Sequence, residues 1–185
     1  MVDVVNSLLQ DHANMARLLD AIEQELAAFD RGERPDYDII QGALEYCLNY
    51  PDLYHHPKED LVWDRLQQRD AEAASALGDL RTEHRTLAEL TRRFAAAVHA
   101  VLHDLEVPRG SFDHAAREFL GRYRHHMAVE EERFFPAAVG KLTADDWAEI
   151  ETEMTERNDP LFDAQSGERF TALREKILTW AAEGA

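Results

Sequence analysis

Apolar residues recur every three or four positions along four long stretches of this 185-residue chain, and this spacing constrains the fold more than any other feature. Residues spaced in this way lie on one side of an α-helix and form a continuous apolar seam. No stretch alternates apolar and polar residues as a half-buried strand does. The spacing therefore predicts an all-α protein.

Glycine and proline gather at a few points, which divide the seams into separate helices. The four seams occupy about residues 3–30, 37–69, 70–105 and 111–140. Because the connections between them are short, each helix is expected to run antiparallel to the one before it. This pattern predicts an up-down-up-down four-helix bundle.

Two of these helices carry more specific signals. The second contains Pro51 and Pro57. Proline lacks a backbone donor and presses on the preceding turn, so we expect a kink there, or a break into two helices. The fourth helix is expected to begin near Ser111, whose hydroxyl can cap its first turn.

The pattern changes beyond Gly140. Thr143 and Asp146 have the spacing of a capping box, which predicts a helix to about residue 157, and a last helix is predicted over residues 168–182. The chain is therefore expected to comprise a bundle domain, residues 1–140, and a helical extension, residues 141–185, packed on the bundle.

The balance of charge argues against two classes of partner. Asp and Glu number 37 against 20 Lys and Arg, which gives a formal net charge of −17. A nucleic-acid backbone or an anionic membrane surface would be repelled by most of this surface, so neither is an expected partner.

Cysteine content and hydropathy bear on the compartment. The single cysteine, Cys47, cannot form an internal disulfide, and no stretch resembles a membrane span or a secretory signal. These features favour a cytoplasmic protein. A homodimer is left open.

Each seam is interrupted by ionisable residues where its spacing calls for an apolar side chain. The interruptions are His12, His55, Glu59, His84, His126 and Glu130. Isolated charges are costly to bury and are tolerated inside when they are paired or bound to a cation. Two of the interruptions are His-x-x-x-Glu pairs, which place an imidazole and a carboxylate on one face of a helix.

Each histidine taken alone has a simpler interpretation. A lone core histidine is more often hydrogen-bonded than ligating, and a single His-x-x-x-Glu pair commonly lies on a solvated face. Six such groups facing one core favour a metal site. The remaining histidines are expected to point elsewhere or to lie on a solvated surface: His56, His99, His103, His114 and His125.

The donor set indicates the kind of metal. Four imidazoles and two carboxylates are too many for one tetrahedral zinc and too rich in nitrogen for calcium or magnesium. If Glu59 and Glu130 both bridge, each of two transition-metal ions receives two histidines and two carboxylate oxygens and keeps open positions. Two iron ions are the expected cofactor, with zinc or manganese as alternatives.

Two segments carry a family resemblance. Residues 54–60, YHHPKED, and residues 126–136, HMAVEEERFFP, resemble the paired motifs of the hemerythrin-like, HHE cation-binding family, and the likeness extends over about residues 5–140. The resemblance implies a four-helix bundle that tolerates Pro57 in its second helix. It also implies a non-haem di-iron centre held by His12, His55, Glu59, His84, His126 and Glu130.

The chain departs from the oxygen-carrying hemerythrins that it resembles. Those proteins have two histidines one turn apart on the third helix, whereas the positions four residues from His84 are Leu80 and Ala88. The difference argues against reversible oxygen carriage. Tyr123, Tyr50 or Tyr54 could supply a phenolate ligand or a hydrogen bond, although packing is the expected role of each. Glu83 or Glu131 could replace the missing donor, although both are expected on a charged surface.

Three functions remain. The first is a metal-binding protein that senses, binds or handles oxygen, nitric oxide or peroxide, or holds iron, so its expected partner is a small diatomic or peroxide ligand. The second is a di-iron enzyme that turns over peroxide or repairs iron centres; repair ranks lower because such relatives usually carry a cysteine-bearing domain before the bundle. The third is a purely structural bundle, against which six buried ionisable groups argue. Motifs of hydrolases and nucleotide-binding enzymes are absent.

Overall fold

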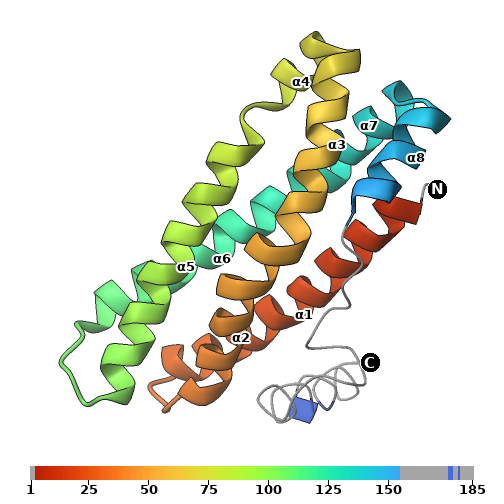
Figure 1. The fold of residues 1–185 in the computed structure, drawn as a ribbon. Helices are drawn as coiled ribbons and strands as arrows, with labels where there is room; N and C mark the ends of the chain where they lie inside the picture. The colour runs from red at the N-terminus through yellow and green to blue at the C-terminus, as the bar shows by residue number, and fades with distance from the viewer. Residues whose placement is uncertain (1–2, 155–174, 177–178, 180–185) are drawn as a thin grey trace.

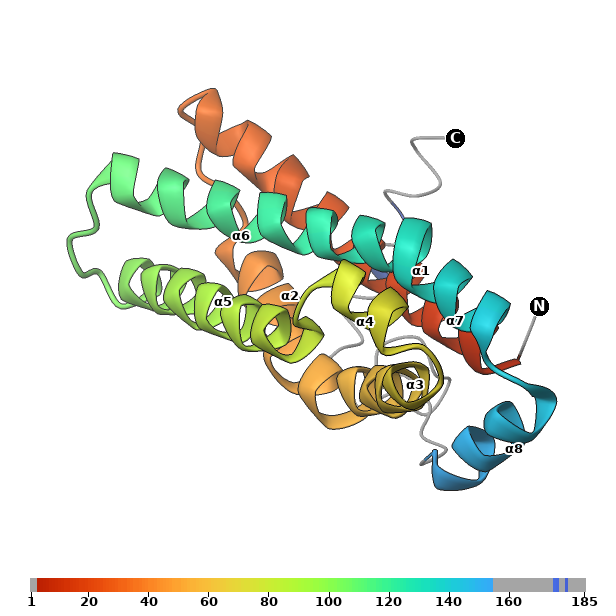
Figure 2. The same ribbon diagram turned by 90° about the horizontal axis from the view of Figure 1, so that it is seen from above.

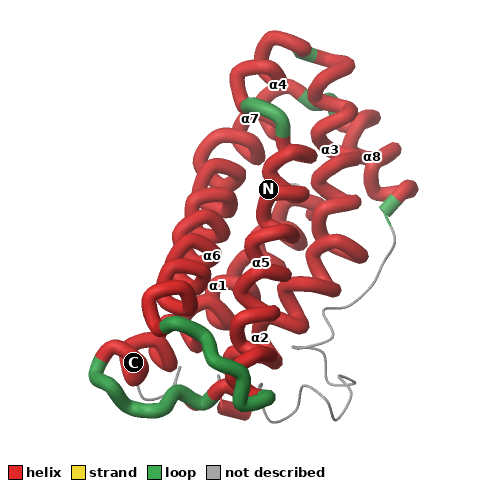
Figure 3. Tube along the Cα trace, turned by 90° about the vertical axis from the view of Figure 1, so that its left-hand side faces the viewer, coloured by secondary structure: helices red, strands yellow, loops and turns green. Residues whose placement is uncertain are grey.

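The computed structural model describes residues 3–154, 175–176 and 179. Within these residues every regular element is a helix and none is a strand, as Figure 3 shows. The prediction of an all-α protein is confirmed.

Four helical arms lie side by side (Figures 1 and 2). α1 (Asp3–Asp30) forms the first arm and α5 (Leu80–Leu102) the third. The second and fourth arms are composites: α2 (Tyr37–Tyr50), η1 (Pro51–His55) and α3 (His56–Arg69), then α6 (Arg109–Val129), η2 (Glu130–Phe134) and α7 (Phe135–Lys141). Consecutive arms run in opposite directions, as expected of an up-and-down helical bundle.

Both composite arms widen into a π-helical turn just before a proline. In each turn a backbone N–H donates to the carbonyl five residues earlier. The donor, acceptor and following proline are His56, Pro51 and Pro57 in η1, and Phe135, Glu130 and Pro136 in η2. A proline inside a helix collides with the preceding turn, and the wider π turn accommodates its ring. The disturbance expected at the prolines is therefore a widened turn and not a break.

The prediction of one continuous third helix over about residues 70–105 is wrong. This segment is divided into α4 (Ala71–Leu77) and α5, because Gly78 has a φ of 92°, a left-handed conformation that glycine adopts without steric cost. Asp79 then caps α5 by accepting a hydrogen bond from the backbone N–H of Thr82 at 3.1 Å. The signal for this break, a Gly-Asp pair at the end of a short apolar segment, is present in the sequence.

The expected cap at Ser111 is also wrong. α6 begins two residues earlier, at Arg109, and follows Pro108 without a side-chain cap. Proline is common at helix starts because its fixed φ suits the first turn and its missing donor is not needed there.

The first C-terminal helix is present as α8 (Ala144–Glu153). Thr143 and Asp146 form the predicted capping box, and Asp146 also accepts hydrogen bonds from Arg69 of α3. Trp147 and Ile150 bury their side chains against the bundle. The end of this helix near residue 157 and the last predicted helix, residues 168–182, lie outside the described residues.

A layer of polar residues divides the core into two apolar clusters. The first cluster draws on α2 and on most of α1, α5 and α6. The second draws on the start of α1 and on α3, α7 and α8. On α1, Leu8 belongs to one cluster and Met15 to the other, and His12 lies between them. The arms therefore position a polar layer part-way along the bundle, with apolar packing on either side.

None of the described helices combines the length and the apolar run needed to cross a membrane. The domain division at residue 140, the cytoplasmic location and the absence of nucleic-acid and membrane partners stay predictions from the sequence. The question of a homodimer stays open as well.

Candidate metal centre

All four arms contribute ionisable side chains to the polar layer. The six predicted residues are His12 on α1, His55 at the end of η1, Glu59 on α3, His84 on α5, His126 on α6 and Glu130 at the start of η2. Each is at most 7% exposed. The structure thus brings the six seam interruptions together, although they lie up to 118 positions apart in the chain.

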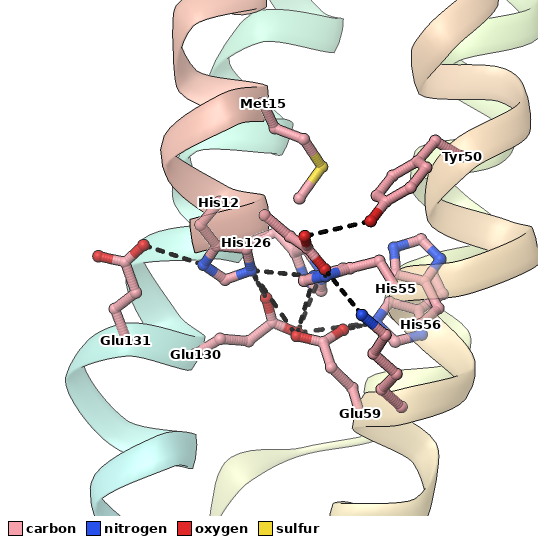
Figure 4. A network of polar contacts seen from close by, with 12 residues as sticks. His12, Met15, Tyr50, His55, His56, Glu59, His126, Glu130 and Glu131 are labelled. Atoms are coloured by element: carbon pink, nitrogen blue, oxygen red, sulfur yellow. Dashed lines mark hydrogen bonds and ion pairs between the residues drawn. The ribbon is translucent and has the colours of Figure 1, made fainter. Parts of the chain in front are cut away.

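Glu59 and Glu130 lie at the centre of the layer and point toward each other from the second and fourth arms (Figure 4). The two oxygens of Glu59 face opposite ways. Its Oε1 lies 3.2 Å from Nε2 of His55 and 3.7 Å from Nε2 of His12. Its Oε2 lies 3.4 Å from Nε2 of His84.

Glu130 is arranged in the same manner. Its Oε2 lies 3.4 Å from Nε2 of His12, and its Oε1 lies 3.2 Å from Nε2 of His126 and 3.6 Å from Nε2 of His84. The layer therefore has a first half, with His12 and His55, and a second half, with His84 and His126. Both carboxylates offer one oxygen to each half.

In the first half, His12 and His55 bring their Nε2 atoms to within 3.1 Å of each other. Nδ1 of His12 donates to Glu131 at 2.9 Å, and Nδ1 of His55 donates to Asp11 at 3.2 Å. A neutral imidazole that donates through Nδ1 keeps a lone pair on Nε2, so the two facing Nε2 atoms need either a proton or a metal cation between them. Two metal–nitrogen bonds of about 2.1 Å at a right angle separate the nitrogens by about 3 Å, which fits this spacing.

The centre of the layer also holds buried polar atoms without a hydrogen-bond partner among the described residues. They are both oxygens of Glu59, both oxygens of Glu130, and Nε2 of His84 and His126. Buried polar atoms are normally hydrogen-bonded, and an unpaired buried carboxylate is costly. Imidazole nitrogens and carboxylate oxygens are donors that transition-metal ions accept, so the residues fit a bound metal cation.

A family model described as the hemerythrin HHE cation binding domain matches residues 3–138. The match covers most of the chain and includes the whole polar layer. The chain belongs to the hemerythrin HHE cation-binding family. No curated protein and no solved structure matches the chain in the other two comparisons.

Asp11 is a buried residue beside the polar layer of this hemerythrin domain that the sequence analysis missed. Besides the hydrogen bond from His55, it accepts hydrogen bonds from the Tyr50 hydroxyl at 3.1 Å and from the buried Lys58 ammonium at 3.3 Å. A carboxylate behind a ligating histidine selects its tautomer and orients its ring. The signal was available, because Asp11 lies three residues after Leu8 and thus falls on the seam of α1.

Other polar neighbours follow the expectations in part. Tyr50 packs in the core, as expected, and also donates a hydrogen bond to Asp11, the alternative role considered for it. Glu131 is exposed, as expected of a charged surface, and also accepts a hydrogen bond from Nδ1 of His12, while Glu83 forms a half-buried ion pair with Arg122. Tyr123 packs in the core with its hydroxyl against the sulfur of Met15.

The expectation that His56 points away from the layer is wrong. His56 is 7% exposed, its ring stacks on that of His84 with centroids 3.8 Å apart, and its Nδ1 donates to Asp52 at 3.0 Å. A π turn rotates successive residues by less than an α-helical turn does, because it contains more residues, so the neighbours His55 and His56 both reach the interior. Pro51 and Pro57, which flank this turn, were the sequence signal that the helix departs from the α-helical period here.

The other excluded histidines lie on the surface. His125 is exposed although it neighbours His126. His99 and His103 stack on each other on an exposed face, and His114 pairs with Glu118. None of these belongs to a potential metal-binding group in the described part of the chain.

The layer shifts the pKa values of its histidines in opposite directions. Burial alone lowers the pKa of His84, but the adjacent Glu130 and Glu59 carboxylates outweigh it and raise the pKa to about 9. For His12, too, carboxylates led by Glu130 outweigh burial and raise the pKa well above its ordinary value. Burial lowers the pKa of His126 to about 4. Without metal, protons on His84 and His12 therefore balance part of the buried negative charge.

The two central carboxylates remain ionised. Burial raises the pKa of Glu59, but the histidines around it, led by His55, hold this pKa well below its ordinary value. Burial and the charge of Glu59 raise the pKa of Glu130, and His12 and His84 outweigh both and lower it. Ionised carboxylates are the form that ligates a cation.

Two hollows reach the second half of the layer. A cavity of about 220 Å³ is lined by apolar side chains such as Trp63 and Leu80, by charged ones such as Arg122, and by His126 and Glu130. A more open groove of about 390 Å³ lies between the second and third arms and contains His56, His84 and Ala88. Leu80 and Ala88, the two positions on α5 that lack a histidine, thus each line one of the hollows.

Proposed function

We propose that the polar layer holds a non-haem di-iron centre, and that this centre binds a small ligand such as dioxygen, nitric oxide or peroxide. One observation carries the proposal: Glu59 and Glu130 each direct one oxygen to either half of the layer. A carboxylate whose two oxygens face histidines in different halves is better placed to bridge two ions than to bind a single ion.

Each half would hold one ion. His12 and His55 would hold the first ion, and His84 and His126 the second, with Glu59 and Glu130 shared. When bound, iron supplies the open positions and the redox chemistry that a small ligand requires. Zinc or manganese could occupy the same donors, so the identity of the metal is part of the test.

The protein's own contribution is to orient the donors and to exclude water. Asp11 and Glu131 hold the rings of His55 and His12 through their Nδ1 atoms, which leaves Nε2 directed at the centre. The apolar clusters above and below the layer keep the surroundings dry. Ionised donors in a dry pocket bind a multivalent cation far more strongly than they bind solvent-exposed sodium or potassium.

The second ion is the one that a small ligand would meet. The cavity of about 220 Å³ that ends at His126 and Glu130 has room for a diatomic molecule or peroxide but is small for a drug-sized substrate. Its lining combines apolar side chains such as Trp63 and Leu80 with the charged side chains of Arg122 and Arg133. We therefore propose that the ligand approaches past Trp63 and Leu80.

Metal analysis of protein produced in iron-replete cells tests the proposal. We expect about two irons per chain, together with an absorption band from charge transfer to ferric iron that changes when nitric oxide or azide is added. Parallel loading with zinc and manganese shows whether the site selects among these ions. Protein that takes up no transition metal, or only one ion per chain after full loading, would refute a di-iron centre.

Peroxide turnover is the second candidate, and the cavity that ends beside the second half favours it. Its test is gas release and peroxide loss catalysed by the loaded protein. A rate no higher than that of the same concentration of free iron would leave binding, and not turnover, as the function.

A further inference from the structure

We infer that His56 is a fifth histidine ligand of the centre and binds the second ion. The inference rests on the proposed function, because it adds a residue to the same site. The donor comes from α3, in the second arm, and not from α5.

The position of His56 supports this role. One ligand atom each from His56, Glu59, His84 and His126 lie within 4.8 Å of one another, and all four residues are buried. The ring of His56 stacks on that of His84 at an angle of 8° and meets that of His126 edge-on at 6.2 Å between centroids, so one of the stacked rings has to turn for His56 and His84 to direct their lone pairs at one ion. His56 thus belongs to the second half of the layer, beside an oxygen of Glu59.

The hydrogen bond behind His56 supports the same role. Its Nδ1 donates to Asp52 at 3.0 Å, in the same way that His12 donates to Glu131 and His55 to Asp11. In all three rings the donated Nδ1 proton leaves the lone pair on Nε2, as a ligating imidazole requires. A structural histidine that satisfies Asp52 would have the same tautomer, so the experiment below has to separate the two roles.

The backbone explains why two consecutive histidines can serve one layer. His55 ends the π turn and His56 begins α3, and the N–H of His56 closes the wide turn on Pro51. The first ion would then have two histidines and the second three. The second half would gain its extra nitrogen from α3, whereas α5 has Leu80 and Ala88 at the positions one turn from His84.

The competing explanation is that His56 is structural: it stacks on His84 and satisfies Asp52. The test therefore uses His56→Ala with His125→Ala as the matched control, because His125 also neighbours a predicted ligand but is exposed. Both variants are loaded with ferrous iron alone and analysed for iron per chain and for their absorption spectra. The thermal melting of the metal-free forms checks that each variant folds.

We expect His56→Ala to lose one iron of two, or both, and His125→Ala to keep both. Added imidazole should restore the iron content of His56→Ala, because the groove beside His56 is open enough to admit it and the truncated side chain leaves room for the ring. A structural defect would not be repaired by a free ligand. If His56→Ala does not fold, His56→Gln, which keeps a polar side chain, is expected to lose iron in the same way.

Two results would overturn the inference. Two irons per chain and an unchanged spectrum in a folded His56 variant would show that the residue is not a ligand, and the di-iron proposal would stand. Iron loss that imidazole does not reverse would assign His56 a structural role. Wild-type protein without transition metal would instead refute the proposed function, and this inference with it, so the two failures are distinguishable.

Discussion

The two halves of the polar layer contain the same kinds of residue but differ in their surroundings. In the first half, Glu131 and Asp11 hold the rings of His12 and His55, whose Nε2 atoms lie 3.1 Å apart. In the second half, His84 and His126 have Nε2 atoms without a hydrogen-bond partner among the described residues, and two hollows end there.

The different surroundings of the two halves suit two different roles in the proposed centre. A closed half with fixed rings suits permanent retention of an ion, whereas a half beside a cavity suits exchange of a small ligand. The two His-x-x-x-Glu motifs are alike in sequence, so the different roles that we propose for the two halves depend on the residues packed around them. The following predictions test that division, beginning with a change that affects both halves.

Glu130→Gln should have the largest effect, because Glu130 offers an oxygen to each half. We expect iron content to fall from about two per chain to near zero, since the variant loses one negative charge and a bridge from both sites. Glu132→Gln is the control, because it removes an exposed carboxylate from the same π turn. Metal analysis after identical loading makes the comparison; retention of two irons in Glu130→Gln would remove the basis for a shared bridge.

His12→Leu and His84→Leu should each lose one iron ion, but they should differ in whether the remaining centre responds to a small ligand. Leucine extends the apolar seam in both cases, so the bundle should remain folded. We expect His84→Leu to abolish the spectral response to nitric oxide or azide, and His12→Leu to keep it. Iron content and ligand titration provide the readouts. The opposite pattern would place ligand binding in the first half and reverse the comparison.

Asp11→Asn should weaken the first half without emptying it. The change removes a charge that Lys58 and His55 share, and orients the His55 ring less firmly. Loss of such a partner typically lowers metal affinity roughly 10- to 100-fold. Competition with a chromophoric chelator measures the affinity of each ion, and we expect the ion of the second half to change less. An equal loss at both ions would show that the halves are not independent.

Metal loading should release protons, and the number should fall as the pH rises. Because the pKa of His84 without metal is about 9, this residue is protonated below pH 9 and must lose its proton to ligate. His126, with a pKa of about 4, is already neutral at pH 7 and releases none. Calorimetric titrations in buffers of different ionisation enthalpy count the protons. Affinity should therefore increase with pH up to about 9; release that does not change between pH 7 and 10 would contradict this assignment.

Periodicity was sufficient to predict most of the bundle and six of the residues in its polar layer, but not Asp11 or His56. The interruptions of the seams marked His12 and His84 correctly as interior positions, because a 3.6-residue period places each of them on the buried face of its helix. The capping box at Thr143 depends on residues three apart and was equally visible. Departures from a regular helix were not predicted: the break at Gly78 and the inward turn of His56 both arise where the backbone leaves the α-helical period.

By itself, the sequence determined that this chain is helical, that its helices are amphipathic, and that histidines and glutamates interrupt their apolar faces. These properties are local, since each depends on the rotation of successive residues around one helix axis. Only the tertiary structure decided which oxygen of Glu59 faces which histidine, which carboxylates hold the rings, and which half of the layer borders a cavity. Those properties depend on the axial alignment of arms that are distant in the chain, and a one-dimensional pattern does not specify that alignment.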